Sequence, residues 1–215
     1  MHVRRVLGAA RIRYSRSMQT QTTPPSTAVV VTHDVESFER WKLAFDRHAD
    51  ARRSAGVIAT HINRDAADPN RLSVYMAGSD AAKLTAFLKS PDLGSTMLDA
   101  GVKGPPSIAA VTPVEDRIQK RPLAGVIVRH AVADYATWKR AFDGDDAARA
   151  AAGIVGYAVN RSVQDPNTVI VYLQAESLDA LRAYTASPRL KQVMTDAGVA
   201  GPPSFTFVNG GTWES

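Results

Sequence analysis

The chain has 215 residues, 45% of them hydrophobic, and contains no cysteine. This length allows one or two globular domains, and the absence of thiols excludes disulfides and thiolate chemistry. No run reaches the roughly 18 consecutive apolar residues of a membrane span, so we expect no membrane segment.

The net charge of +5 comes from the start of the chain, because residues 1–17 contain five arginines and no acidic residue. The other 21 basic side chains equal the 21 acidic ones, which argues against a nucleic-acid-binding face. We expect residues 1–26 to be a disordered basic arm, although the composition also suits a mitochondrial transit peptide or attachment to an anionic surface. The expected location is cytoplasmic, or mitochondrial if the arm is a transit peptide.

The residues after the arm predict the element order β-α-β-β-α-β. β-branched and alternating patterns predict four strands at residues 28–33, 57–64, 72–77 and 108–111. Helical spacing predicts helices at 34–54, 80–88 and 90–101. Gly56 ends the first helix, Ser90-Pro91 begins the last, and Asp68-Pro69-Asn70 forms the tight turn of a hairpin.

The same pattern occurs twice. With a shift of 97 positions, residues 28–112 align on 125–209 without a gap, and more than a third of the aligned residues are identical. The expected organisation is a basic arm, a first repeat, a linker, a second repeat and a tail, at residues 1–26, 27–112, 113–123, 124–210 and 211–215.

Each repeat has the ferredoxin-like order, which places helices on one face of a sheet and leaves the other face bare. A bare apolar face needs a cover, and the second copy supplies one. We therefore predict an α+β protein in which two tandem ferredoxin-like repeats pack sheet to sheet as a pseudo-dimeric α/β barrel. Whether two such chains pair further is left open.

Several shared segments carry a resemblance to a known superfamily. They are the strand ending in His33, the Phe38-x-x-Trp41-Lys42-x-x-Phe45-Asp46 helix, the Asp68-Pro69-Asn70 turn, Ser90-Pro91-x-Leu93 and the exit Ala100-Gly101-Val102-x-Gly104-Pro105-Pro106. With their copies in the second repeat, they resemble the dimeric α/β-barrel superfamily, including antibiotic biosynthesis monooxygenase-like proteins. The superfamily also includes haem enzymes, isomerases, lyases and non-enzymatic binders, so the resemblance implies a fold and not one chemistry.

Strand alternation predicts which side chains enter the central cavity. Leu72, Val74 and Met76 form an apolar set that should face the helices, which turns Tyr75 toward the cavity together with its equivalent Tyr172. Asn63 and Asn160 are assigned to the cavity by the same argument. Asn63 could hydrogen-bond an oxyanion or cap the adjacent turn.

The histidines and tryptophans have two interpretations each. His33 and His130 could act as a general base or ligand, or could be hydrogen-bonded to backbone where strand meets helix. For Trp41, which lies in the apolar stripe of its helix, packing in the core is favoured over contact with a substrate. Arg52 and Arg149 are expected in surface salt bridges with Asp46 and Asp143. No ligand spacing supports a metal site, no glycine-rich loop supports a nucleotide, and the short repeats argue against haem, so we expect no cofactor.

The resulting hypothesis is a cofactor-independent monooxygenase that acts on a small aromatic or polyketide-like molecule. We expect the catalytic residues in the first repeat, at His33, His61, Asn63 and Tyr75, and the substrate-binding residues at Trp41, His130, Asn160 and Tyr172. The alternatives are a non-enzymatic barrel that binds a small hydrophobic molecule or acts in stress, and an isomerase or lyase on the same scaffold. No nucleic-acid or membrane partner is expected.

Overall fold

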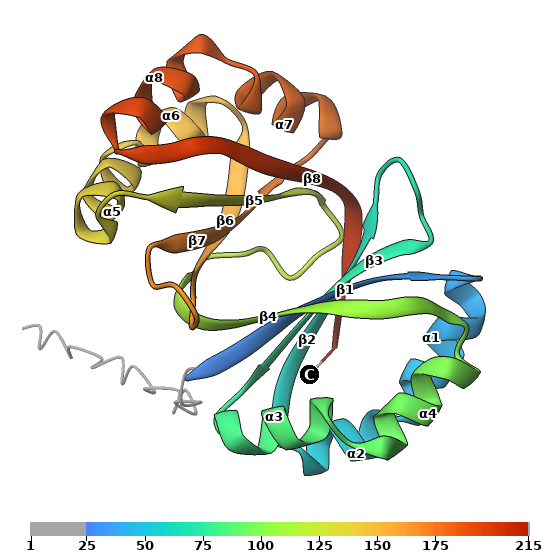
Figure 1. The fold of residues 1–215 in the computed structure, drawn as a ribbon. Coiled ribbons are helices and arrows are strands. Elements are labelled where there is room, and N and C mark those ends of the chain that lie inside the picture. The colour runs from blue at the N-terminus through green and yellow to red at the C-terminus, as the bar shows by residue number, and fades with distance from the viewer. Residues whose placement is uncertain (1–24, 215) are drawn as a thin grey trace, which may run out of the picture.

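A computed structural model describes residues 25–214, and its two halves repeat one order of elements (Figure 1). The first half comprises β1 (Thr27–Val35), α1 (Phe38–Arg47), α2 (Ala49–Ser54), β2 (Val57–Asp65), β3 (Arg71–Gly78), α3 (Ala81–Leu88), α4 (Pro91–Asp99) and β4 (Val102–Asp116). The second comprises β5 (Ala124–Val132), α5 (Tyr135–Gly144), α6 (Asp146–Ala151), β6 (Ile154–Ser162), β7 (Thr168–Ala175), α7 (Leu178–Thr185), α8 (Pro188–Asp196) and β8 (Val199–Glu214). Most of the arm, residues 1–24, lies outside the described residues.

Local chemistry sets the helix ends as the sequence predicts. The Ser90 hydroxyl accepts a hydrogen bond from the Leu93 N–H, and Pro91 occupies the first turn of α4. Gly56 and Gly101 follow helices with φ of +79°, a conformation that glycine adopts without a Cβ clash. The predicted helix 34–54 is instead two helices that meet at His48, where the backbone leaves helical geometry.

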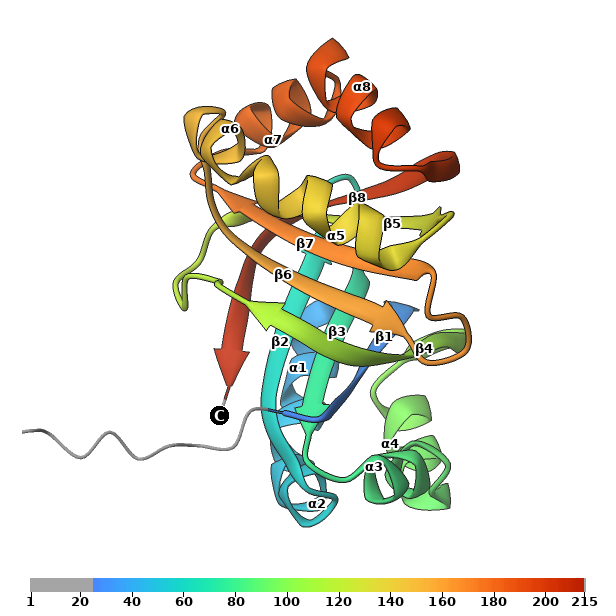
Figure 2. The ribbon, with the colours of Figure 1, turned by 90° about the vertical axis from the view of Figure 1, so that its left-hand side faces the viewer.

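The eight strands form one closed antiparallel barrel in the order β1-β3-β2-β8-β5-β7-β6-β4. Figures 1 and 2 show the strands in the middle, with the helices of each half covering opposite outer sides. The predicted α+β fold of two tandem ferredoxin-like repeats is therefore confirmed. Closure leaves no free strand edge within the barrel.

The barrel closes through residues that the sequence analysis placed in the linker and the tail. β4 pairs with β1 and then continues to β6, where Asp116 lies opposite Ala158. β8 likewise pairs with β5 and continues to β2, where Trp213 lies opposite His61. The prediction of a strand over 108–111 alone was wrong, because the ends of β4 and β8 satisfy backbone groups on the edges of β6 and β2.

Alternation along the strands separates a helix-facing core from the barrel interior. Leu72, Val74 and Met76 are buried in the core of the first half, as predicted. Val169, Val171 and Leu173 occupy the same places in the second half. Tyr75 and Tyr172 lie on the opposite face and line the barrel interior.

The recurring arginines are buried, which corrects the prediction of surface salt bridges with Asp46 and Asp143. Arg52 and Arg149 are 6% and 2% exposed. The guanidinium of Arg52 lies 3.4 Å from the ring centroid of Phe45 and donates a hydrogen bond to the Phe45 carbonyl. Asp46 pairs with Lys42 instead. The arginine stems fill apolar volume while the charged head bonds to a helix carbonyl.

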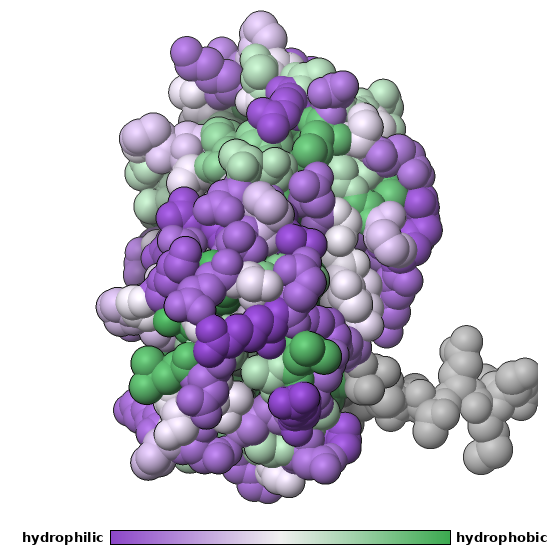
Figure 3. All heavy atoms as spheres, turned by 90° about the vertical axis from the view of Figure 1, so that its right-hand side faces the viewer, coloured by the Kyte–Doolittle hydropathy of each residue, from purple (hydrophilic) through white to green (hydrophobic). Residues whose placement is uncertain are grey.

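The surface carries apolar side chains in separate patches among polar ones, as Figure 3 shows for one face. Within residues 25–214, no helix combines the length and apolar character that crossing a membrane requires.

Candidate functional site

The sheet divides the predicted site residues between two places. His33, Trp41 and His130 lie on the helix side, whereas five others line the barrel interior: His61, Asn63, Tyr75, Asn160 and Tyr172. The structure therefore does not bring His33 and His61 together in one pocket, as the expected catalytic set would require. The reason is register, because His33 pairs with Leu72, whose side chain faces the helices.

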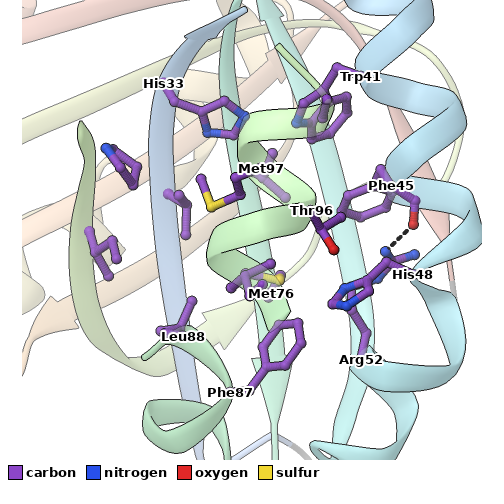
Figure 4. Close-up of a pocket in the computed structure, with 16 residues that line it drawn as sticks. His33, Trp41, Phe45, His48, Arg52, Met76, Phe87, Leu88, Thr96 and Met97 are labelled. Carbon is purple, nitrogen blue, oxygen red and sulfur yellow. Dashed lines mark hydrogen bonds between the residues drawn. The ribbon is translucent and has the colours of Figure 1, made fainter. Parts of the chain in front are cut away.

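The helix-side pocket of the first half lies between the sheet and helices α1–α4 (Figure 4). Its empty volume is about 650 Å³ when the open solvent at its mouth is included. Its walls are mainly apolar, and six of the side chains that form them are Val31, Val74, Met76, Phe87, Leu93 and Met97. An apolar pocket with a few polar groups is the usual form of a small-molecule site.

His33 is the polar group of this pocket with the least satisfied side chain. It is 7% exposed, and neither ring nitrogen has a hydrogen-bond partner among the described residues. This contradicts the alternative of a histidine hydrogen-bonded to backbone. Burial lowers the pKa of His33 to about 4, although Asp34 opposes the shift. The ring is therefore neutral near pH 7 and offers a pocket ligand one N–H donor and one acceptor.

Trp41 of α1 packs against the imidazole and stacks on Phe45 of the same helix. The ring centroid of Trp41 lies 5.6 Å from that of His33 and 4.9 Å from that of Phe45. Trp41 is 4% exposed and belongs to the core, yet it also lines the pocket. Figure 4 shows His33 and Trp41 near one end and Arg52 near the other. The pocket thus has a neutral base at one end and a cation at the other.

The second half repeats this pocket in a smaller form. His130 and Trp138 occupy the equivalent places in about 510 Å³ of space. Both nitrogens of His130 also lack partners, and burial lowers its pKa to about 4. Asp145 replaces His48 and pairs with Arg189 across the pocket wall. The duplicated chemistry is the buried imidazole beside tryptophan.

The barrel interior brings together a different set. The Tyr172 hydroxyl donates to Asn63 Oδ1 at 3.2 Å, and Asn63 Nδ2 lies 3.4 Å from His61 Nδ1. Tyr75 and Asn160 line the same cavity. Within residues 25–214, neither forms a side-chain hydrogen bond to Tyr172, Asn63 or His61. Asn63 therefore bonds across the barrel to the second half and does not cap its own turn.

Sequence reasoning missed Trp213, which stacks on His61 with ring centroids 3.9 Å apart and an interplanar angle of 11°. It lies in the predicted tail, residues 211–215. One signal was available, because the other two tryptophans occupy equivalent positions in the repeats and Trp213 has no counterpart. A tryptophan beyond the last predicted strand indicates further packed structure there, because tryptophan is highly buried on average.

Across residues 25–214, no group of three or more histidine or acidic side chains is arranged to hold a metal ion.

No model of a known protein family matches this sequence, and no curated protein matches it. Solved structures do. An anthrone oxidase-like protein is 14% identical with a TM-score of 0.66, and the match covers 90% of this chain and 94% of that one. A chlorite dismutase variant from Candidatus Nitrospira defluvii is 12% identical with a TM-score of 0.54, covering 87% and 92%.

A ferredoxin-fold protein of Listeria monocytogenes, related to antibiotic biosynthesis monooxygenases, is also similar. It is 10% identical with a TM-score of 0.52, and the match covers 86% of this chain and 95% of that one. The chain is thus structurally similar to monooxygenase-like and chlorite dismutase dimeric α/β-barrel proteins. At these identities the similarity establishes the fold alone.

Proposed function

We propose that this protein is a cofactor-independent oxygenase that acts on a small aromatic or polyketide-like molecule in the helix-side pocket of the first half. The observation that carries the proposal is the buried His33 imidazole, which has no hydrogen-bond partner and lies in an otherwise mainly apolar wall. Such a group gains a partner when a hydroxyl-bearing aromatic molecule enters.

The pocket residues would divide the chemistry between them. His33, neutral near pH 7, accepts a proton from an activated hydroxyl or methylene of the substrate. The Trp41 ring and the neighbouring apolar side chains hold the planar molecule and exclude water. Arg52 contributes a positive charge that stabilises the substrate anion.

The anion then reacts with oxygen directly. With an anthrone, the deprotonated ring transfers electrons to O₂ and a carbon–oxygen bond forms at the former methylene. One oxygen atom remains as the new ketone, and the other leaves as water with the two hydrogens of the methylene. No other oxidant is needed, so the protein supplies only a base, a binding surface and a dry site.

A second candidate function is binding without turnover. The observation that favours it is the pKa of His33 near 4, because an imidazole of that pKa is a weak base toward a free phenol. In that case His33 would orient a bound hydroxyl and would not deprotonate it.

Oxygen uptake by metal-free protein, measured with a panel of anthrones and hydroquinones, separates the two functions. We expect uptake to fall at least about 100-fold in His33→Phe, since general-base catalysis contributes about that much. His130→Phe is the matched control in the other half, and Asn63→Ala is the control for the barrel interior. Absence of uptake with retained binding would support the binding function, and equal loss in all three variants would contradict the assignment to the first pocket.

A further inference from the structure

The barrel interior contains a chain of polar groups with a defined direction. The Tyr172 hydroxyl donates to Asn63 Oδ1, and the Asn63 amide nitrogen lies against His61 Nδ1. An amide nitrogen only donates, so Nδ1 of His61 accepts and the ring hydrogen lies on Nε2. His61 is 3% exposed, and its Nε2 has no hydrogen-bond partner among residues 25–214. The chain of groups therefore ends on a buried donor without an acceptor.

Trp213 adds a second such donor beside the first. Its Nε1 is also buried without a partner in the described part of the chain. The two rings stack almost parallel, from positions paired across β2 and β8. Two N–H donors thus lie on adjacent stacked rings. Buried donors without acceptors are rare in native proteins and call for a partner.

The arrangement is specific to one side of the barrel. The positions equivalent to His61 and Trp213 in the duplicated pattern are Ala158 and Asp116, which pair across β6 and β4. Gly211 makes the difference possible, because a Cβ there would overlap His61 Nε2. The equivalent position carries Val114. The aromatic pair fills one side, and the small Ala158 leaves open space on the other.

That space is part of a pocket whose empty volume is about 640 Å³ when the open solvent at its mouth is included. Tyrosine rings and isoleucine side chains form much of its wall, at Tyr75, Tyr172, Ile127 and Ile170. Burial raises the pKa of both tyrosines and lowers that of His61 to about 4, so these three groups are neutral near pH 7. Flat apolar walls, neutral polar groups and two unpaired donors suit an uncharged planar molecule with one strong acceptor oxygen.

Carboxylates at the cavity make an anionic ligand unfavourable. Glu115 and Asp116 both line it. Glu115 pairs with Lys139 and Arg117, and Asp116 accepts a hydrogen bond from the Ile118 N–H at 3.1 Å. A carbonyl oxygen meets the two donors without adding charge beside these acids.

We propose that the barrel interior is a second ligand site, separate from the helix-side pockets, which binds a neutral planar aromatic ketone through its carbonyl oxygen on His61 Nε2 and Trp213 Nε1. The flat ring system of the ligand lies among the tyrosine and isoleucine side chains. The site goes beyond the proposed oxygenase function, because it uses neither His33 nor Trp41.

The probe is 1-indanone, and its matched control is indane, which has the same rings without the carbonyl. The ¹⁵N–¹H spectrum of the full chain shows one indole signal for each of the three tryptophans, and the Trp213→Phe variant assigns that of Trp213. We expect 1-indanone to shift the Trp213 signal while the Trp41 and Trp138 signals stay in place. Those two signals report on the helix-side pockets, so failure of one site is distinguishable from failure of the other.

Variants then test the two donors. Trp213→Phe keeps a stacking ring and removes the N–H, so affinity for 1-indanone should fall about tenfold, the usual effect of one hydrogen bond. His61→Phe removes the other donor in the same way. Thr212→Val, an exposed neighbour on β8, is the control and should leave affinity unchanged. Spectra of each free variant establish that it is folded.

Three results would overturn the proposal. They are no binding of 1-indanone, binding of indane with equal affinity, and shifts confined to the Trp41 and Trp138 signals. If Trp213→Phe does not fold, the comparison of 1-indanone with indane and the His61→Phe variant still decide the question.

Discussion

The two faces of the barrel sheet differ in how far they follow the sequence repeat. On the helix side, both halves keep a buried histidine against a tryptophan, His33 with Trp41 and His130 with Trp138. In the barrel interior, His61 stacks on Trp213, whereas the equivalent pair is Ala158 with Asp116. The contact between histidine and tryptophan is thus present twice on the helix side and once in the barrel interior.

The difference shows what one fused chain permits. In a symmetric dimer, a substitution that places a large ring at the centre of the barrel appears twice and must fit against its own copy. Here one side gains His61 and Trp213 while the other stays small at Ala158. An asymmetric interior can therefore hold both a donor pair and the space for a ligand.

The largest expected effect is on stability at low pH. His33, His61 and His130 each have a pKa of about 4 in the folded protein against 6.5 when exposed. Below pH 6.5 the unfolded chain binds these protons and the folded chain does not, so stability present above pH 6.5 is lost as the pH falls toward 4. Urea unfolding should show a loss of about 2 kcal/mol for each histidine between pH 7.5 and 5.

Single histidine variants compare the two halves by their contribution to this pH dependence of stability. His33→Phe and His130→Phe should each reduce the pH dependence by a similar amount, since both rings are buried beside a tryptophan and both have a pKa of about 4. A reduction in only one of them would show that the two helix-side pockets are not equivalent.

The next largest effect concerns Gly211. Gly211→Val should destabilise the fold by about 3 kcal/mol, because the new Cβ overlaps the His61 ring and approaches Asn63 Oδ1 too closely. The double variant with His61→Ala recreates the Val114–Ala158 arrangement of the other side and should recover much of that loss. Urea unfolding of the two single variants and the double variant gives the coupling energy. Additive losses would contradict the steric explanation.

The smallest expected effect is on the stability contributed by two ion pairs. In each pair, a carboxylate from outside the aligned repeats binds one of two equivalent lysines. Glu214 lies 2.9 Å from Lys42, and Glu115 lies 3.1 Å from Lys139. Glu115 also pairs with Arg117 at 2.7 Å and accepts a hydrogen bond from the Tyr157 hydroxyl at 2.9 Å, whereas the further partner of Glu214, Arg52, lies at 3.5 Å. Glu115→Gln should therefore cost about 1 kcal/mol and Glu214→Gln less. Thermal unfolding at low and high salt measures both. A larger cost for Glu214→Gln would reverse this ranking.

The repeat made most of the fold predictable, because each element could be assigned twice from independent sequences. Alternation in the third strand of each repeat placed Tyr75 and Tyr172 on the interior face, where the structure has them. Alternation in the first strand also indicates the helix side for His33, since Val29, Val31 and Val35 share its face.

The rest depended on pairing between distant strands. Residues 113–116 and 211–214 have little strand character of their own and are ordered by the edges of β6 and β2. No local pattern reports such a partner, since strand preference depends on the neighbouring strand. Trp213 was missed for this reason, and with it the stacked pair that completes the barrel interior.

The long strands β4 and β8 also have a consequence for folding. Each begins in the sheet of its own half and ends by pairing with the other, so neither half holds its complete set of strand partners by itself. We therefore expect the two repeats to fold and unfold as one cooperative unit, although each carries a complete copy of the repeated sequence. A chain cut within residues 117–123 would yield two fragments that reach full stability only by reassociating, each completing its partner's sheet.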